Sequence, residues 1–267
     1  MEEKSRQGAG FISLKAIYYN NMTTLRLAKF LACSGVASRR AAEELIQQGL
    51  VSINGKKCTA LYTMVDPVVD TVTYRGKPVS IEHKEYYLLH KPKGYVCTNT
   101  GGAKTKRAVD LISTKARLFT VGRLDKETSG LIIVTNDGDF ANRIMHPSFE
   151  IPKEYLVKTD KEVLHDHLVK IADGVIVEGK HVKPLSVKKV RRGTLKVVVL
   201  DGRKHEVRLL CEHAGLEVIE LVRIRVGHLV LGGLPEGASK PLTVKERGPF
   251  FKNDDADKPA RRAKVQR

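Results

Sequence analysis

Asp125 is the residue of this chain whose type and surroundings point most directly to chemistry. It lies in the segment VGRLDKETSGLIIVTNDGD, two residues after Arg123 and shortly before the apolar run Leu131–Val134, which predicts a buried strand. A carboxylate there can act as a nucleophile or a base, but its desolvation is costly unless a partner offsets it. Arg123 and Lys126 are local candidates, and Ser129-Gly130 is the predicted turn. These residues alone leave open whether Asp125 reacts or only forms a local cap or ion pair.

The sequence does not contain other common patterns of reactive residues. HKPKG lacks the frame of a phosphate-binding P-loop, RKHEVRLLCEH lacks the HExxH zinc pattern, and Ser129 lacks the GxSxG frame of a serine hydrolase. The cysteines follow no zinc-binding spacing, and we expect free, buried or half-buried thiols at Cys33, Cys58, Cys97 and Cys211. The sequence therefore predicts neither a hydrolytic site nor a metal site.

The charge of the chain favours a polyanionic partner. Its 267 residues include 47 basic and 30 acidic side chains, a formal net charge of +17, so nucleic acid is the first candidate. Aromatic residues make up only 6%, which argues against a broad stacking platform for single strands. The apolar runs are too short for a membrane helix, and the first residues do not follow the order of a secretory signal. We expect a cytoplasmic protein without a membrane partner.

The first module of the chain is predicted to form two short helices and a hairpin. Apolar residues within Leu25–Ala32 share one helical face, and Gly35 suits the position that ends this helix. Ser38 is typical of the N-cap of a second helix, and Asn54-Gly55 predicts a tight hairpin turn.

Two arginines, Arg39 and Arg40, stand in the first turn of the second predicted helix. Positive charge there opposes the helix dipole. The pair is therefore either a solvated helix end or a phosphate contact, and the surrounding module favours the phosphate contact.

The rest of the chain is predicted to form an α+β domain on a mainly antiparallel mixed sheet. Short runs rich in Val, Ile and Leu come in hairpin-like groups, and helices interrupt them at DGDFANRIMHP, DKEVLHDHLVKIADG and RKHEVRLLCEHAG. Residues 75–86 are predicted to be a linker. The expected divisions are an extension at 1–21, a helical domain with its linker at 22–82, the α+β domain at 83–248 and a basic disordered tail at 249–267. Met1 and Met22 are both candidate starts.

Two parts of the chain resemble known families. RLAKFLACSGVASRRAAEELIQQGLVSINGK resembles the S-four RNA-binding domain, named for the small-subunit ribosomal protein. VGRLDKETSGLIIVTNDGDFANRIMHPSFEIPKEYLVK resembles the active-site region of bacterial ribosomal RNA pseudouridine synthases. LLHKPKGYVCT, DGRKHEVRLLCEHAGLEVIELVRIRVG and LGGLPEGASKPLT resemble further motifs of those enzymes. The chain is most similar to the RsuA-like family, which joins an S-four domain to a catalytic domain, over about residues 24–245.

The resemblance implies a reaction and a partner. Uridine in ribosomal RNA would be isomerised to pseudouridine: the base leaves its ribose at N1, turns and is rejoined through C5. No metal and no cofactor is implied. NRIMHPSFEIPKEY is more similar to the large-subunit members, so we favour 23S over 16S ribosomal RNA, either free or within assembling particles. We expect a monomer.

Site roles carry over onto the matching positions of this sequence. Asp125 matches the catalytic aspartate, and Arg208 matches the arginine that pairs with it, which predicts a bidentate ion pair. Tyr155 matches the tyrosine that stacks on the target base. Val207 either presses on the other face of the ring or is an ordinary β-branched core residue. Arg123 matches the residue that fills the gap left by the flipped base.

Three lysines are weaker candidates for substrate contacts. Each is either a phosphate contact or structural, and the residues leave both open: Lys91, Lys153 and Lys204. The sequence departs from the family pattern at His205 and Lys240, and neither departure touches the catalytic assignment.

The alternative function is that of a non-enzymatic RNA-binding protein in ribosome assembly. It rests on the S-four-like module and on the charge. The presence of both Asp125 and Tyr155 favours the enzyme.

Overall fold

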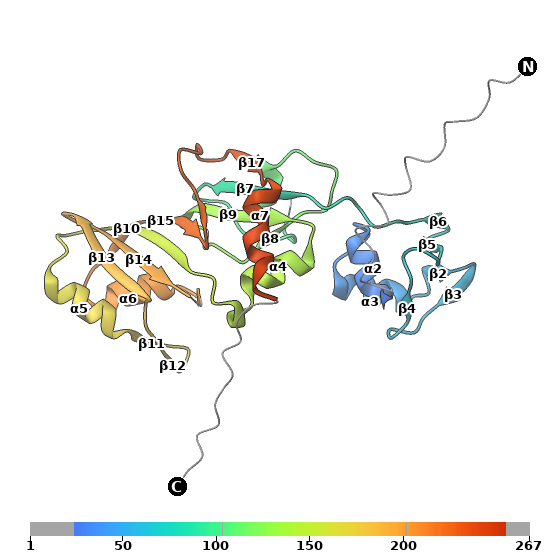
Figure 1. Ribbon diagram of the computed structural model, residues 1–267, viewed down its shortest axis with the longest axis horizontal. Helices are drawn as coiled ribbons and strands as arrows, with labels where there is room; N and C mark the ends of the chain where they lie inside the picture. The colour runs from blue at the N-terminus through green and yellow to red at the C-terminus, as the bar shows by residue number, and fades with distance from the viewer. Residues whose placement is uncertain (1–23, 103, 201, 255–267) are drawn as a thin grey trace, which may run out of the picture. The chain divides into compact units, whose positions relative to one another are not determined.

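The computed structural model describes residues 24–254 except Ala103 and Asp201, and the chain divides into two compact units between His83 and Lys84 (Figure 1). The predicted extension at 1–21, Met22 and residues 255–267 lie outside the described residues. Each unit is described by itself.

The first unit packs two helices against short strands. Its elements are β1 (Leu25–Arg26), α2 (Leu27–Cys33), α3 (Arg39–Gln47), β2 (Val51–Ile53), β3 (Lys56–Cys58), β4 (Met64–Val65), β5 (Val72–Tyr74) and β6 (Lys77–Pro78). The strands pair as β1-β4 and as β3-β2-β5-β6. Its core lies between the apolar faces of α2 and α3 and the inner side of the larger sheet.

Three local predictions for this unit are confirmed. The Ser38 hydroxyl accepts a hydrogen bond from the Ala41 amide at 3.2 Å and so caps α3. Gly35 follows α2 in the left-handed region at φ +73°. Asn54 and Gly55 both have positive φ, as the tight turn between β2 and β3 requires.

The predicted linker is shorter in the structure. Lys77–Pro78 form β6, Ile81 packs against the first unit's core, and the Glu82 amide donates to the Cys33 carbonyl at 3.0 Å. Most of residues 75–82 therefore fold with the first unit, because Ile81 gives this polar stretch an apolar anchor.

The second unit is built on one mixed sheet. Its strands are β7 (Tyr86–Lys91), β8 (Phe119–Val121), β9 (Ser129–Thr135), β10 (Lys153–Thr159), β11 (Val175–Val177), β12 (Lys180–Val182), β13 (Ser186–Arg191), β14 (Thr194–Val199), β15 (Val218–Val226), β16 (Leu229–Val230) and β17 (Ser239–Pro241). Its helices are η1 (Ala108–Leu111), α4 (Gly138–Met145), η2 (Pro147–Phe149), α5 (His165–Asp173), α6 (Glu206–His213), α7 (Val244–Arg247) and η3 (Gly248–Asp254).

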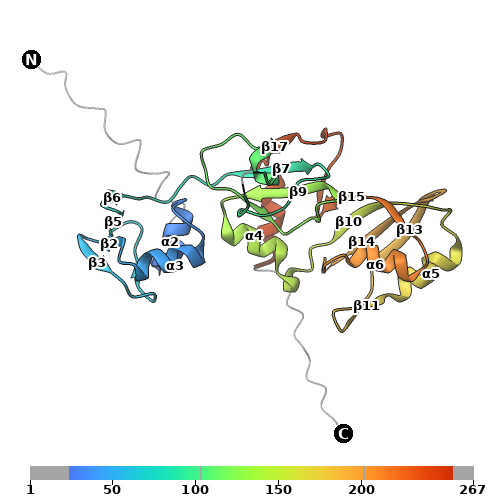
Figure 2. The same cartoon turned by 180° about the vertical axis from the view of Figure 1, so that it is seen from behind.

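Most pairings in this sheet are antiparallel, which confirms the predicted α+β class. The strand order is β13-β14-β10-β15-β9-β7-β17, with β8 added at β9 and β16 at β15, and β11 and β12 form a separate hairpin. Among the described pairings of the large sheet, only β9 with β15 is parallel. The three predicted helices are α4, α5 and α6; α5 and α6 lie with β10, β13 and β14, and α4 lies near β8 and β9 (Figures 1 and 2).

Strand β9 is buried along its whole length, as the apolar run predicted. Ile132 and Val134 point into one hydrophobic cluster, which includes α6, whereas Leu131 and Ile133 point into a second, which includes α4. Successive side chains of a strand alternate between faces, so one continuous apolar run serves both cores.

The prediction that Ser129-Gly130 forms a turn is wrong, because these residues begin β9. Gly130 has φ +113°, and a Cβ there would lie 2.3 Å from the carbonyl oxygen of Arg223 in β15. The glycine is required for close approach of two backbones. The turn lies just before it, at Asp125–Thr128.

Residues 249–254, which were predicted to belong to a disordered tail, are folded in the structure. Gly248–Asp254 form η3, and the buried ring of Phe250 makes an edge contact with Phe140 of α4, with ring centroids 5.7 Å apart. Residues 249–254 therefore fold with the second unit.

The four cysteines are free and buried or half-buried, as predicted. Cys211 is the most enclosed, and burial raises the pKa of its thiol to about 12. In residues 24–254, gaps aside, no helix is long and apolar enough to cross a bilayer.

Asp137 joins α4 to the sheet. Its carboxylate accepts hydrogen bonds from the Asp139 and Phe140 amides and, at 2.7 Å, from the Tyr86 hydroxyl, and it lies 3.0 Å from the Lys84 ammonium. Burial by itself would raise the pKa of Asp137, but the Tyr86 hydroxyl and the Lys84 charge hold that pKa below its ordinary value. The ionised carboxylate therefore stabilises the fold.

We expect Asp137→Asn to lower the free energy of unfolding by about 1.5–3 kcal/mol at pH 7, since it removes charge-assisted hydrogen bonds. The loss should shrink as the pH falls below about 4, because protonation then removes the same charge from the wild type. Urea unfolding at several pH values measures both effects. Asp166→Asn, in the exposed first turn of α5, is the matched control. A loss that is constant from pH 7 to pH 3 would contradict the assignment.

Candidate active site

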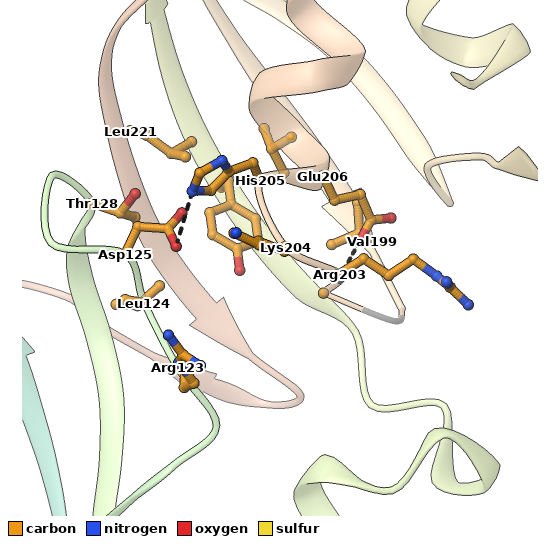
Figure 3. A pocket seen from close by; sticks show the side chains of 13 residues that line it. Arg123, Leu124, Asp125, Thr128, Val199, Arg203, Lys204, His205, Glu206 and Leu221 are labelled. Atoms are coloured by element: carbon orange, nitrogen blue, oxygen red, sulfur yellow. Dashed lines mark hydrogen bonds and ion pairs between the residues drawn. The ribbon is translucent and has the colours of Figure 1, made fainter. Parts of the chain in front are cut away.

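A cavity of about 310 Å³ lies between the loop that joins β8 to β9 and the segment that leads into α6 (Figure 3). The β8–β9 loop contributes Arg123, Leu124, Asp125 and Thr128, and the second segment contributes residues 202–207. Tyr155 of β10, Val199 of β14 and Leu221 of β15 complete the lining. Residues far apart in the chain thus meet around Asp125.

The Asp125–Thr128 turn is held mainly through its backbone. The Thr128 amide donates to the Asp125 carbonyl at 3.1 Å and closes the turn. The Lys126 carbonyl accepts from the Gly94 amide at 2.8 Å, and the Glu127 carbonyl accepts from Arg208 Nη2 at 3.3 Å. These bonds fix the backbone path of the turn, and its side chains therefore remain available for contacts with a substrate.

His205 is the side chain that faces the Asp125 carboxylate. Its Nε2 lies 3.5 Å from Asp125 Oδ1 (Figure 3). His205 is the N-cap of α6 and has φ +56°, an unusual conformation for a residue other than glycine. Both side chains are partly exposed, so this contact contributes little stability. The sequence marked His205 as a departure from the family pattern but assigned it no role.

The predicted bidentate pair between Asp125 and Arg208 is not formed. Among the described residues, the hydrogen bonds of Arg208 go to the carbonyls of Val218 and Glu127, both at 3.3 Å. Val207 faces the cavity, and the next residue of a helix points about 100° further round the axis. Arg208 therefore reaches the start of β15 and the back of the Asp125 loop.

Tyr155, Val207 and Arg123 all line the cavity, and the roles that the resemblance implies for them stay predictions. Tyr155 and Val207 are buried, and Arg123 is exposed. Tyr155 lies between Val197 and Arg223 in the sheet, where a register shift between Glu154 and Tyr155 interrupts the pairing with β15. Such irregularities re-aim a side chain.

The three candidate lysines differ in their surroundings. Lys204 is exposed and lines the cavity. Lys153 lies outside the lining and donates to the Leu200 carbonyl at the end of β14. Both Arg39 and Arg40 are exposed on α3 of the first unit.

Of the two roles left open for Lys91, the structure favours the structural one. Its side chain is fully buried, and its ammonium donates to the carbonyls of Pro92 and Tyr95 at 2.9 Å and to that of Lys126 at 3.5 Å. Burial lowers the pKa of Lys91, and nearby groups, among them Cys97, Glu127 and Asp125, act in the opposite direction. Lys91 is thus another anchor of the Asp125 turn.

Sequence reasoning gave no role to Thr128 or Glu206. Glu206 is buried in the first turn of α6 and accepts from the Arg203 amide at 2.8 Å, which shapes the segment before the helix. Thr128 follows Asp125 by three residues, and that spacing in a tight turn was the available signal.

The site offers acid–base or nucleophilic chemistry by the Asp125 carboxylate beside apolar side chains, whereas the Glu206 carboxylate of the lining accepts the Arg203 amide. Cationic side chains, Arg123 and Lys204, stand at its edge and suit an anionic substrate. Among residues 24–254, apart from the two gaps, no group of three or more His, Cys, Asp or Glu side chains could hold a metal ion.

Comparisons with known proteins agree with this geometry. Residues 85–213 match the RNA pseudouridylate synthase family, and residues 25–68 match the S4 domain, which is the S-four domain of the sequence analysis. A putative chloroplastic ribosomal large subunit pseudouridine synthase of Arabidopsis thaliana is 45% identical over 76% of this chain, which spans about half, 54%, of that relative.

A second relative and a solved structure cover the chain more evenly. Ribosomal large subunit pseudouridine synthase B of Bacillus subtilis is 39% identical over 83% of this chain and 93% of its own length. A crystal structure of a pseudouridylate synthase aligns with a TM-score of 0.62 and 29% identity, over 85% of this chain and 99% of that one. The chain therefore belongs to the RsuA-like family of RNA pseudouridine synthases, which join an S-four domain to a catalytic domain.

Proposed function

We propose that this protein isomerises uridine to pseudouridine in large-subunit ribosomal RNA, with Asp125 as the nucleophile or base. The observation that carries the proposal is the placement of Asp125 at a cavity that Tyr155 and Val207 also line. The names of relatives that act on the large ribosomal subunit support 23S over 16S ribosomal RNA. A monomer that acts in the cytoplasm, on free RNA or on assembling particles, is part of the proposal.

The reaction conserves every atom. The bond from ribose C1′ to uracil N1 breaks, a bond from C1′ to C5 forms, the C5 proton leaves, and N1 gains a proton. The target nucleotide must leave the RNA stack, which costs a few kcal/mol. Arg123 fills the vacated place in the stack, and Tyr155 and Val207 hold the extruded ring.

Residues of the chain hold the Asp125 turn in position and limit the access of water to the cavity. The backbone anchors from Arg208 and Lys91 keep the Asp125 turn from shifting while the ring turns. The apolar walls limit the access of water, which would otherwise trap the detached base as a hydrolysis product. Arg39 and Arg40 of the S-four unit bind phosphates elsewhere on the same RNA.

We expect Asp125→Asn to bind 23S ribosomal RNA normally and to lower pseudouridine formation by about a hundredfold or more. The measurement is carbodiimide-stop mapping of 23S and 16S transcripts after incubation with purified protein. Asp173→Asn, exposed at the end of α5, is the control. An Asp125→Asn variant that modifies RNA at the wild-type rate would refute the assignment of Asp125. A wild type that binds both RNAs and modifies neither would favour the assembly-factor alternative.

Lys204→Met and Lys91→Met should separate a phosphate contact from a structural lysine. Removing the exposed Lys204 should weaken RNA binding and reduce the slope of log affinity against log salt by about 1. Removing the buried Lys91 should leave that slope unchanged and lower both the melting temperature and the turnover rate, because three carbonyls lose a donor. Filter binding over a range of potassium chloride concentrations gives the slopes. Equal slope changes in the two variants would contradict these roles.

A further inference from the structure

Thr128 has a buried hydroxyl that lacks a hydrogen-bond partner among the described residues. Its side chain is 1% exposed, and Oγ1 is sealed from solvent. Most buried polar groups in folded proteins are hydrogen-bonded, and an exception at a reactive site calls for a functional explanation.

The closed surroundings of this hydroxyl favour a protein group as its partner. Because Oγ1 is closed off from solvent, a substrate atom cannot reach it without a rearrangement of the wall. Asp125 carries the carboxylate of this turn that lines the cavity: the two residues open and close one turn, through the 3.1 Å bond from the Thr128 amide to the Asp125 carbonyl. Their side chains line the same cavity (Figure 3).

The Asp125 carboxylate is held only loosely in its present position. The 3.5 Å separation from His205 Nε2 exceeds the usual range of a strong charge-assisted hydrogen bond. A rotation of the Asp125 side chain can therefore exchange this contact for another with little loss.

We propose that Thr128 is a positioning residue, whose hydroxyl donates to the Asp125 carboxylate in the RNA-bound state after Asp125 leaves His205. This inference rests on the proposed function. One carboxylate oxygen is then fixed by Thr128, and the other faces the nucleotide. A hydroxyl-to-carboxylate bond is short and strong, and it satisfies the orphaned hydroxyl.

RNA itself supplies the trigger for this exchange. His205 follows Arg203 and Lys204 in a cationic segment that lines the cavity. A phosphate that binds this segment competes with Asp125 for the imidazole. Loading of RNA and alignment of the carboxylate are thereby coupled through one side-chain rotation.

Thr128→Val tests the role because valine keeps the shape and removes the hydroxyl. We expect an unchanged or higher melting temperature, an unchanged RNA affinity, and a turnover number lowered by about 10- to 100-fold with an unchanged KM. Thr128→Ser should stay within about threefold of the wild type. Turnover is followed as tritium released from RNA labelled at uridine C5. Thr135→Val is the contrast, because the buried Thr135 hydroxyl donates to the Glu85 carbonyl, and this variant should melt at a lower temperature.

Two results would overturn the inference. One is a Thr128→Val variant with wild-type turnover; the other is parallel loss of stability and activity in Thr128→Val and Thr128→Ser, which indicates a purely structural role. A structure of the wild-type chain with a 23S ribosomal RNA fragment tests the proposal independently of turnover. We expect the Asp125 carboxylate to contact the Thr128 hydroxyl in that structure. A carboxylate that still contacts His205 would refute the proposal. Absence of wild-type tritium release would instead refute the proposed function.

Discussion

The arrangement of the catalytic unit depends on how the four-residue turn Asp125–Thr128 is attached to the sheet. On one side it continues into β9, which is buried on both faces and cannot move without disrupting two hydrophobic clusters. On the other side, its carbonyls are bound by Arg208, Lys91 and the Gly94 amide. Because these anchors act on the backbone, the path of the turn is fixed, while the Asp125 carboxylate can still rotate and forms no ion pair with arginine among the described residues.

Under the proposed function, the two units contribute differently to RNA recognition because their charges and surfaces differ. The catalytic unit presents a small cavity with apolar walls and cations at its edge, which suits one extruded nucleotide and little else. The S-four unit presents exposed arginines on a capped helix, which suit phosphates. Under the proposed function, we expect specificity for a single uridine to require that both units bind the same RNA at once.

The sequence predicted the secondary-structure elements well, but it predicted the hydrogen-bond and ion-pair partners of individual side chains poorly. The α+β class, the caps of α2 and α3 and the buried β9 followed from periodicity and local chemistry. The predicted ion pair between Arg208 and Asp125 was wrong. The motif indicates that the two residues lie near each other, but it does not show that the backbone carbonyls of Val218 and Glu127 bind the Arg208 guanidinium instead. The role of Lys91 was left open for a related reason. Its acceptors are three backbone carbonyls, and the sequence does not indicate which carbonyls a side chain will reach.

The most direct test of the central claim is the structure of the Asp125→Asn variant bound to the 23S ribosomal RNA segment that the wild type modifies. The account predicts that the target uridine is extruded into the cavity, with its ring on Tyr155, its C1′ in contact with the side chain at position 125, and Arg123 in the vacated stack. A uridine that remains stacked in the RNA, or that enters the protein away from the Asp125 turn, would contradict the account.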